Sequence, residues 1–244
     1  MSAAPRHLIV VPAWNESGSI REVVNELRQH LPEADILVID DGSTDATLDR
    51  VPPCATVVSL PFNLGIGVAV QTGFRYAAMH GYDVAIQVDA DGQHPAREVH
   101  KLLEPLARGE ADMVVGSRFL DARGPEGFRQ SATRMAGIRV LSLLLRLLTG
   151  SRFTDCTSGF RAVNRPVIRA FSHWYPDDYP EPEVILLLQR AGFRVVEVPV
   201  RMKPRAAGRS SIPLLRGLFY VIKVSVALVL DTMRRPWPKG RLTP

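Results

Sequence analysis

The feature that most constrains the fold is a repeated alternation between short apolar runs and helical patterns. Residues 8–11, 36–39, 56–60, 84–88 and 113–115 are almost continuously apolar. Strands that are buried on both faces of a parallel sheet have this composition. Between them, residues 17–30, 65–80 and 95–106 have the pattern of helices. The alternation predicts an α/β fold with a mostly parallel, Rossmann-like sheet flanked by helices.

Polar residues stand directly after four of these runs. Ligands of parallel sheets bind beyond the carboxyl ends of the strands, so we expect these residues to gather at one edge. They are Trp14, Asn15 and Glu16 after the first run, Asp40 and Asp41 after the second, Asn63 after the third, and Asp89 and Asp91 after the fourth.

Asp89 and Asp91 are separated by one residue and followed by Gly92. Two carboxylates at this spacing can face one ion where the backbone turns, and a glycine allows that turn. Such hard oxygen ligands suit Mg²⁺ or Mn²⁺, which commonly bind substrate phosphates as well. The alternative is a solvated loop after a strand. Asp40 and Asp41 begin a second acidic turn, which either contacts a ribose or base or caps the next helix through an Asx turn.

The charge balance points to an anionic partner. The formal net charge of the 244 residues is +5, which fits a nucleic acid, a membrane surface or a phosphorylated small molecule. No basic stripe with interleaved aromatic residues is present, so we do not expect nucleic acid. The two cysteines, Cys54 and Cys156, have no metal-ligand spacing, and a reducing cytoplasm fits them.

The chain carries its apolar surplus in two segments, 132–148 and 214–230. No segment reaches the roughly 18 to 20 apolar residues of a spanning helix, and the N-terminus lacks the pattern of a secretory leader. We therefore divide the chain into a catalytic domain, residues 1–212, and a C-terminal apolar helix and basic tail, residues 213–244. In 132–148, a helix at an anionic bilayer surface and a core-facing amphipathic helix both explain one shared apolar face. That face consists of Met135, Ile138, Leu141, Leu144, Leu145 and Leu148.

Six ordered motifs resemble those of the family 2 glycosyltransferases. They are VPAWNE at 11–16, VIDDGSTD at 38–45, NLGIG at 63–67, QVDADGQHP at 87–95, GSR at 116–118 and TSGFR at 157–161. Within that family the sequence is most similar to the dolichol-phosphate mannosyltransferase and polyprenyl-phosphate glycosyltransferase branch. The resemblance implies a GT-A fold, a nucleotide-sugar donor, and inversion at the anomeric carbon.

The resemblance also assigns roles on the donor side. It implies that Asp40 and Asp41 lie near the base and ribose, that Asp89 contacts the ribose or the metal, and that Asp91 and Gln93 contact the metal and diphosphate. Asn63, with Gly65 and Gly67, either brings backbone close to the nucleotide or serves tight helix packing. The remaining residues implied for the nucleotide pocket are Pro12, Ala13, Asn15, Glu16 and Ala90.

On the acceptor side, Asp155 is the candidate base or acceptor-positioning group, with a turn carboxylate as the alternative. A phosphate monoester is already largely ionised at neutral pH, since its second pKa is about 6, whereas a hydroxyl acceptor needs a base. Glu181 and Glu183 are weaker candidates.

His94 is expected to hydrogen-bond locally. The arginines with candidate phosphate-binding roles are Arg118 and Arg161, inside the motifs, and Arg205 and Arg209, in a basic loop that resembles the family's loop over the donor.

These residues support one leading function and two alternatives. The leading hypothesis is a metal-dependent transfer of a hexose from a GDP- or UDP-sugar to polyprenyl phosphate, with Mg²⁺ or Mn²⁺ and peripheral docking on the cytoplasmic face of a membrane. The first alternative is a soluble transferase with a hydroxyl acceptor. The second is a non-catalytic, membrane-binding protein with a transferase fold. The sequence does not indicate the sugar, the base or the oligomeric state.

Overall fold

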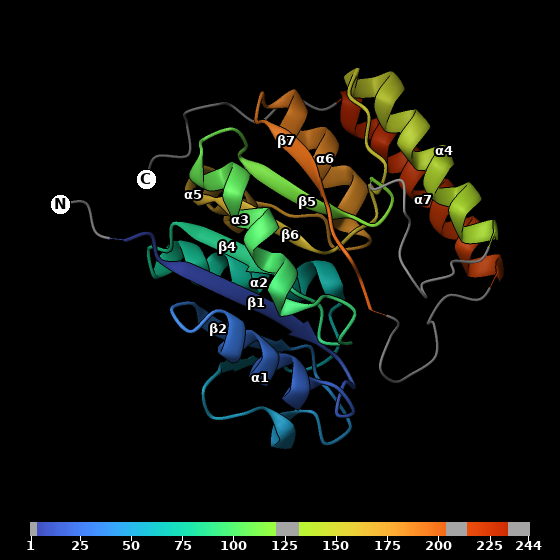
Figure 1. The fold of residues 1–244 in the computed structure, drawn as a ribbon. Coiled ribbons are helices and arrows are strands. Elements are labelled where there is room, and N and C mark those ends of the chain that lie inside the picture. The colour runs from blue at the N-terminus through green and yellow to red at the C-terminus, as the bar shows by residue number, and fades with distance from the viewer. Residues whose placement is uncertain (1–3, 121–131, 204–213, 234–244) are drawn as a thin grey trace.

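A computed structural model describes residues 4–120, 132–203 and 214–233 and shows a seven-stranded sheet in the order β3-β2-β1-β4-β6-β5-β7 (Figure 1). Among the strands of the described residues, only β6 runs antiparallel to its neighbours, so the predicted α/β architecture is confirmed. The strands are β1 (His7–Ala13), β2 (Asp35–Asp40), β3 (Thr56–Ser59), β4 (Val84–Gln87), β5 (Met113–Ser117), β6 (Arg161–Asn164) and β7 (Val195–Pro199).

Helices cover both faces of the sheet. Their bounds are α1 (Ile20–His30), α2 (Ile66–Met79), α3 (Val99–Ala107), α4 (Ala132–Thr149), α5 (Arg165–His173), α6 (Pro180–Arg190) and α7 (Leu214–Met233). Alternate residues of one strand enter different cores, because side chains point to opposite faces of a sheet. Leu8 and Val10 of β1 belong to the core that includes residues of α2, α4, α5 and α6, whereas Ile9 and Val11 belong to the core that includes residues of α1 and α3.

Three elements differ from the sequence prediction. The run at 56–60 forms β3, which is an edge strand with mostly exposed residues and is not buried on both faces. Residues 165–173 and 180–190, for which the sequence patterns above predicted no helix, form α5 and α6. Pro166 and Pro180 lie in the first turns of these helices, where a missing N–H costs no hydrogen bond. Proline therefore opens these helices and does not break them.

The reversed strand β6 decides the geometry of the site. Its first residue, Arg161, pairs with Gln87 in β4 and with Val115 in β5. Because β6 is antiparallel to both, its beginning lies at the edge where β4 and β5 end. The motif that precedes β6 therefore meets the polar residues that follow β4 and β5.

Helices α4 and α7 pack side by side at one end of the molecule (Figure 1). The apolar face predicted for α4 turns inward, since Ile138, Leu141 and Leu145 are buried. The core-facing interpretation is therefore the correct one for that face. No helix among the residues placed by the structure is long and apolar enough to cross a membrane.

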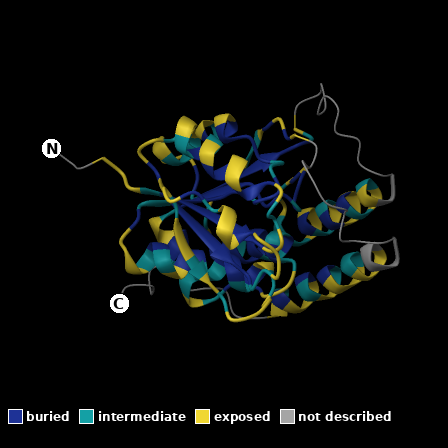
Figure 2. Cartoon of the chain, turned by 90° about the horizontal axis from the view of Figure 1, so that it is seen from below, coloured by how far each residue is buried: buried dark blue, intermediate teal, exposed yellow. Residues whose placement is uncertain are grey.

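A different apolar stripe on these helices faces outward, and Figure 2 shows exposed residues along both of them. On α4 it comprises Val140, Leu143 and Leu147; on α7 it comprises Leu218, Phe219, Ile222, Val226, Val229, Leu230 and Met233. The three- and four-residue spacing keeps each stripe on one side of its helix.

Candidate functional site

The loops after β1 and β2 are tied together at the carboxyl edge of the sheet. Asn15 has a positive φ of 55°, a conformation that asparagine tolerates better than most residues. Its N–H donates to Ser43 Oγ at 2.9 Å, and its Oδ1 accepts from the Thr44 N–H at 2.8 Å. The Glu16 N–H donates to Thr47 Oγ1 at 2.8 Å. Pro12 and Ala13, at the end of β1, are buried below this junction.

Asp41 ties the loop after β3 to the same edge of the sheet. This buried carboxylate accepts from the Leu64 N–H at 2.7 Å and the Gly65 N–H at 2.9 Å, directly after the exposed Asn63. Neighbouring Asp40 accepts from the Ser43 N–H at 3.3 Å. Gly42 has φ of 65°, and a Cβ there would lie 2.5 Å from the backbone of Phe62. The turn after β2 therefore needs glycine both for its conformation and for the close passage of the next loop.

The surroundings of Gly67 show which of the two roles considered for the NLGIG glycines applies to it. A Cβ at Gly67 would lie 2.1 Å from the carbonyl oxygen of Pro176, and the Gly67 N–H donates to the Asp177 carbonyl at 3.1 Å. This glycine serves tight packing between α2 and the loop before α6. Gly65 has a positive φ of 96°, and a Cβ there would make only an ordinary contact of 3.8 Å with the Asp177 carbonyl oxygen.

The DADGQH segment folds back on itself after β4. The Gln93 N–H donates to Asp91 Oδ1 at 3.0 Å, and the Asp89 N–H donates to His94 Nδ1 at 3.0 Å. Because that nitrogen accepts, a neutral His94 carries its proton on Nε2. The His94 ring stacks on Phe160 with centroids 4.8 Å apart. The predicted local hydrogen-bonding role of His94 is confirmed.

The donor set at this segment fits a hard divalent cation. Asp89, Asp91 and Gln93 supply carboxylate and amide oxygens within five residues, and Asp91 is buried. Within the described part of the chain no three His, Cys, Asp or Glu side chains form a complete metal cage. Mg²⁺ and Mn²⁺ suit such a partial site, since water and substrate phosphates commonly complete their coordination.

Arg118 and Asp155 form a buried, bidentate ion pair between residues 116–118 and residues 154–161, two segments that we call the acceptor motifs after their predicted role. Arg118 Nε lies 2.6 Å from Asp155 Oδ2, and Arg118 Nη2 lies 2.6 Å from Asp155 Oδ1. Burial alone would lower the pKa of the Arg118 guanidinium, but the hydrogen bonds and charge of Asp155 raise it overall. Arg118 stays charged, and both oxygens of Asp155 are occupied by it.

Arg161 is held by backbone carbonyls. Its Nε donates to Ser158 O at 2.7 Å and its Nη2 donates to Glu181 O at 2.9 Å. The side chain is buried, and Nη1 has no hydrogen-bond partner among the described residues. Burial raises the pKa of Glu181, and the Arg161 charge opposes that rise. A cationic group with unused donor capacity thus stands beside a carboxyl with raised proton affinity.

The motif of Arg161 also meets the DAD segment. A Cβ at Gly159 would lie 3.1 Å from Asp89 Oδ2 and 3.1 Å from Gln87 Nε2. Gln87 Nε2 donates to Asp89 Oδ1 at 3.3 Å. The carboxylates predicted to bind the donor therefore lie close to the segment that carries Arg161.

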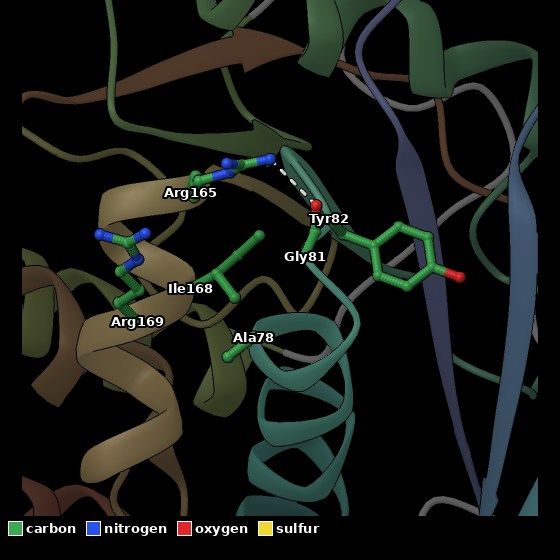
Figure 3. Close-up of a pocket in the computed structure, with 6 residues that line it drawn as sticks. All are labelled: Ala78, Gly81, Tyr82, Arg165, Ile168 and Arg169. Atoms are coloured by element: carbon green, nitrogen blue, oxygen red, sulfur yellow. Dashed lines mark hydrogen bonds between the residues drawn. The ribbon is translucent and has the colours of Figure 1, made fainter. Parts of the chain in front are cut away.

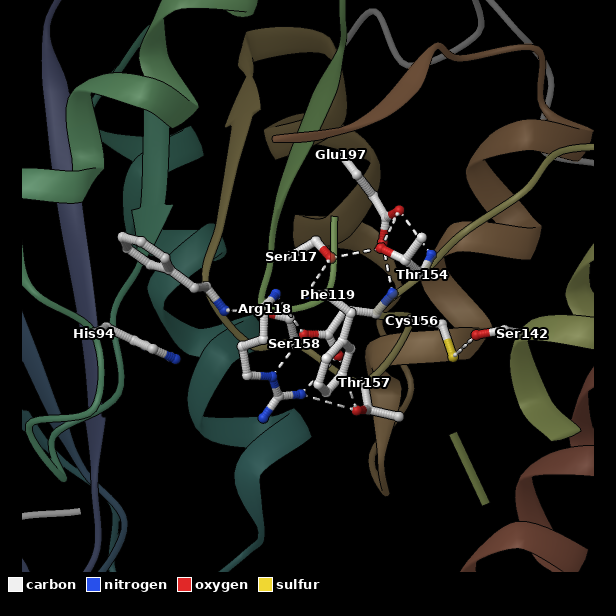
Figure 4. A network of polar contacts seen from close by, with 12 residues as sticks. His94, Ser117, Arg118, Phe119, Ser142, Thr154, Cys156, Thr157, Ser158 and Glu197 are labelled. Carbon is white, nitrogen blue, oxygen red and sulfur yellow. Dashed lines mark hydrogen bonds and ion pairs between the residues drawn. The ribbon is translucent and has the colours of Figure 1, made fainter. Parts of the chain in front are cut away.

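Glu197 of β7 joins the acceptor motifs and was missed by the sequence analysis (Figure 4). Its carboxylate accepts from the Thr154 N–H and the Asp155 N–H, both at 2.7 Å. One signal was available in the sequence, because Glu197 is the single charged residue within the strand VVEVP. A charge flanked by apolar strand residues needs a specific partner.

Arg205 and Arg209 lie outside the described residues, as does the boundary between the two predicted domains. The chain that leads to them is anchored beside the metal-binding candidates. The Lys203 N–H donates to the Gln93 carbonyl at 2.9 Å, and Lys203 Nζ lies 2.9 Å from Glu26 Oε2. Arg205 follows two residues later along the chain.

A separate cavity of about 40 Å³ lies at the opposite end of β4 (Figure 3). Arg165 Nη2 closes one side by donating to the Gly81 carbonyl at 2.9 Å. Ligand pockets for small molecules usually measure about 300–1,000 Å³, so this cavity is too small for a nucleotide sugar. Its lining residues are Ala78, Gly81, Tyr82, Arg165, Ile168 and Arg169.

Comparison with known sequences identifies relatives over most of the chain. The model of the family described as glycosyl transferase family 2 matches residues 8–171. An undecaprenyl-phosphate mannosyltransferase of Micrococcus luteus is 33% identical over 217 residues, which cover 84% of this chain and 86% of the relative. A polyprenol monophosphomannose synthase of Mycolicibacterium smegmatis is 31% identical over 242 residues, which cover 94% and 90%.

Comparison with solved structures supports the GT-A fold. The glucosyl-3-phosphoglycerate synthase of Mycobacterium tuberculosis, crystallised with Mn²⁺, uridine diphosphate and glucosyl-3-phosphoglycerate, superposes with a TM-score of 0.71. The match covers 93% of this chain and 80% of that one, at 21% identity. At this identity the likeness concerns the fold.

Proposed function

The chain belongs to glycosyl transferase family 2, and from this premise we propose that it transfers a hexose from a nucleotide diphosphate sugar to polyprenyl or dolichyl phosphate. The products are a glycosyl phosphoryl lipid and a nucleoside diphosphate. Relatives that cover nearly the whole chain are an undecaprenyl-phosphate mannosyltransferase and a polyprenol monophosphomannose synthase, which supports this acceptor class.

The donor side would bind the nucleotide at the loops after β1, β2 and β3. The tied loops of Asn15, Asp40 and Asp41 form a fixed carboxyl edge that suits a ribose and a base. Asp89, Asp91 and Gln93 would hold Mg²⁺ or Mn²⁺ together with the diphosphate. The bound ion would supply charge neutralisation for the departing diphosphate. Lys203, hydrogen-bonded to Gln93, leads to Arg205 and Arg209, which we assign to the same phosphates.

The acceptor side would use Arg118 and Arg161 to bind and orient the lipid phosphate. One phosphate oxygen attacks the anomeric carbon, the bond from that carbon to the donor phosphate oxygen breaks, and its electrons leave with the nucleoside diphosphate. An ionised phosphate needs no base for this step, since its second pKa is about 6. Asp155 then acts by holding Arg118, with both carboxylate oxygens 2.6 Å from that guanidinium.

One observation carries the choice of acceptor. Two buried guanidinium groups stand beside the donor carboxylates, and Arg118 lies close enough to Asp89 for their charges to attract. Arg161 Nη1 has no hydrogen-bond partner among the described residues and can donate to a phosphate oxygen, whereas a hydroxyl acceptor carries no negative charge for the two guanidinium groups to bind. The hydroxyl alternative is favoured only by Glu181, a carboxyl of raised pKa beside Arg161 that would serve as the base.

The outward stripe of α4 and α7 would rest on the membrane that holds the acceptor. Phe219 and Leu147 are 64% and 74% exposed, and the exposed cations Arg139 and Arg146 lie on α4 itself. Apolar side chains with flanking cations suit the interface of an anionic bilayer. Docking would be peripheral and on the face where nucleotide sugars occur, the cytoplasmic one.

The deciding experiment offers both acceptors to the same enzyme. Purified protein is incubated with Mg²⁺ or Mn²⁺, labelled GDP- or UDP-sugars, and either polyprenyl phosphate in detergent or a hydroxyl acceptor. Label in the organic phase is the expected result. Product formed only with the hydroxyl acceptor would contradict the lipid proposal, and no turnover or hydrolysis of any donor would favour the non-catalytic alternative.

A further inference from the structure

Glu197 lies in β7, outside every motif that carries the proposed reaction, yet it contacts the acceptor motifs directly. We propose that Glu197 is a positioning residue that fixes the Arg118–Asp155 pair through Thr154. The inference concerns how Arg118 is oriented, and it rests on the proposed function only for the identity of the phosphate that Arg118 binds.

Three donors converge on the Glu197 carboxylate. Oε1 accepts from the Asp155 N–H at 2.7 Å, while Oε2 accepts from the Thr154 N–H at 2.7 Å and from Thr154 Oγ1 at 2.9 Å. An ionised carboxylate only accepts hydrogen bonds. The Thr154 hydroxyl must therefore donate its proton to Glu197.

That direction fixes the next bond as well. Ser117 Oγ lies 2.6 Å from Thr154 Oγ1, whose proton is already directed to Glu197, so the Ser117 hydroxyl donates to Thr154. Ser117 Oγ in turn accepts from the Phe119 N–H at 3.2 Å. Figure 4 shows the links from Ser117 through Thr154 to Glu197, with the guanidinium of Arg118 below them.

The chain holds both segments from which the ion pair extends. Thr154 precedes Asp155, and Ser117 and Phe119 flank Arg118. β7 pairs with β5, and Val115 lies opposite Glu197. The Glu197 carboxylate is therefore anchored beside the strand that ends just before Arg118. Movement of the Glu197 side chain would shift both partners of the pair together.

A carboxylate at this position needs an explanation beyond stability. Burial raises the pKa of Glu197, and none of the described Lys or Arg side chains forms an ion pair with it that would offset that cost. An amide would bring one accepting oxygen and one NH₂ donor to a place where three donors converge. Glutamate fits this position because both of its carboxylate oxygens accept hydrogen bonds, as the three converging donors require.

The test compares variants that break the chain at different links. Thr154→Val keeps the side-chain shape and both backbone bonds but removes the hydroxyl, whereas Thr154→Ser keeps the hydroxyl. We expect Thr154→Val and Glu197→Gln to raise the KM for polyprenyl phosphate about tenfold or more, as loss of a charge-assisted hydrogen bond does. The KM for the nucleotide sugar should stay unchanged, and Thr154→Ser should resemble the wild type.

Asp112→Asn supplies the matched control. Asp112 accepts from the Arg194 N–H at 2.8 Å and ties β5 to β7 at the other end of the same strands. The Asp112→Asn variant therefore loosens the sheet but leaves the hydrogen bonds of Ser117, Thr154 and Glu197 in place. If Asp112→Asn raised the acceptor KM as much as Glu197→Gln, or if Thr154→Val behaved like Thr154→Ser, the positioning role would be wrong.

A second measurement does not depend on turnover. The Arg118 Nε–H, bound at 2.6 Å to Asp155, should give a downfield, slowly exchanging ¹H–¹⁵N signal in nuclear magnetic resonance. We expect Glu197→Gln and Thr154→Val to shift or broaden this signal, and Asp112→Asn to leave it in place. An unchanged signal in Glu197→Gln overturns the inference. A shifted signal in an enzyme that transfers no sugar to lipid phosphate refutes only the proposed function.

Discussion

Arg118 meets Asp155 edge to edge, with two nitrogen–oxygen distances of 2.6 Å and side chains that are only 6% and 0% exposed. Each charge has been taken out of water and depends on the other. The pair comes from two motifs 37 residues apart, which the sheet brings together through β5 and the loop before β6.

Removal of one partner should therefore destabilise the protein more than removal of both. Asp155→Asn leaves the guanidinium uncompensated, a change that typically costs about 3–5 kcal/mol of unfolding free energy. Arg118→Met combined with Asp155→Asn removes both charges and should recover much of that loss. Urea unfolding measures the stability of both variants. Transfer to lipid phosphate should be abolished in the double variant even where stability recovers, because that variant lacks the Arg118 guanidinium. A double variant less stable than Asp155→Asn would contradict this account.

Asp91→Asn should weaken metal binding without unfolding the chain. The change removes one anionic oxygen from the partial site of Asp89, Asp91 and Gln93, whereas the Gln93 N–H can still donate to the amide oxygen. We expect at least about a tenfold weaker affinity for Mn²⁺, measured by electron paramagnetic resonance in the presence of nucleoside diphosphate. Asp83→Asn is the control, because Asp83 precedes the other end of β4 and pairs with Arg165. Equal Mn²⁺ affinity in the Asp91 and Asp83 variants would remove Asp91 from the site.

The gathering of the loops after β1, β2, β3 and β4 at one edge could be predicted from the sequence because its signals are local. Each apolar run that ends in Asn15, Asp41 or Asp89 makes a strand, and parallel strands bring their ends to one edge. Gly42 marked the turn, and the structure shows that a Cβ there meets the backbone of Phe62. Periodicity and turn chemistry were enough to place these loops at one edge, whereas the nucleotide and metal roles of their residues came from the family resemblance and stay predictions.

The arrangement of Arg118, Asp155 and Glu197 depended on contacts that no local pattern encodes. β6 is four residues long and reversed, so its place between β4 and β5 is set by packing of the whole sheet. The occupation of Asp155 by Arg118, and the role of Glu197, follow from that placement. Likewise, the apolar face predicted for α4 has the same sequence pattern whether it packs against a core or a membrane. Only the fold shows that Leu141 and Leu145 of this face are buried.

Acid should remove the stabilising effect of Asp112. Burial would raise the pKa of this carboxyl, but hydrogen bonds from the Arg194 N–H and Asn164 lower it overall. A folded pKa below the unfolded value of about 3.9 means that the stabilisation is present above that pH and is lost as pH falls through the folded pKa. Asp112→Asn should cost about 1–3 kcal/mol at pH 7, and less at pH 3. Urea unfolding at both pH values checks this, and a gap as large at pH 3 as at pH 7 would argue against it.

Charged substitutions on the outward stripe should release the protein from membranes and leave its chemistry intact. Leu147→Glu on α4 and Phe219→Glu on α7 place carboxylates where exposed apolar side chains would enter the interface, so each variant loses buried apolar area and gains repulsion from anionic lipid. Vesicle co-sedimentation with anionic and neutral liposomes should show at least about a tenfold weaker binding for the double variant.

Met79→Glu is the matched control for that experiment, because Met79 is 82% exposed at the end of α2 and belongs to neither α4 nor α7. It should bind vesicles like the wild type. Transfer to polyprenyl phosphate in detergent should be equal in all variants, while transfer to the same lipid in vesicles should fall only in the stripe variants. Loss of activity in detergent would mean that the stripe supports the fold, and unchanged binding to vesicles would exclude it as the docking surface.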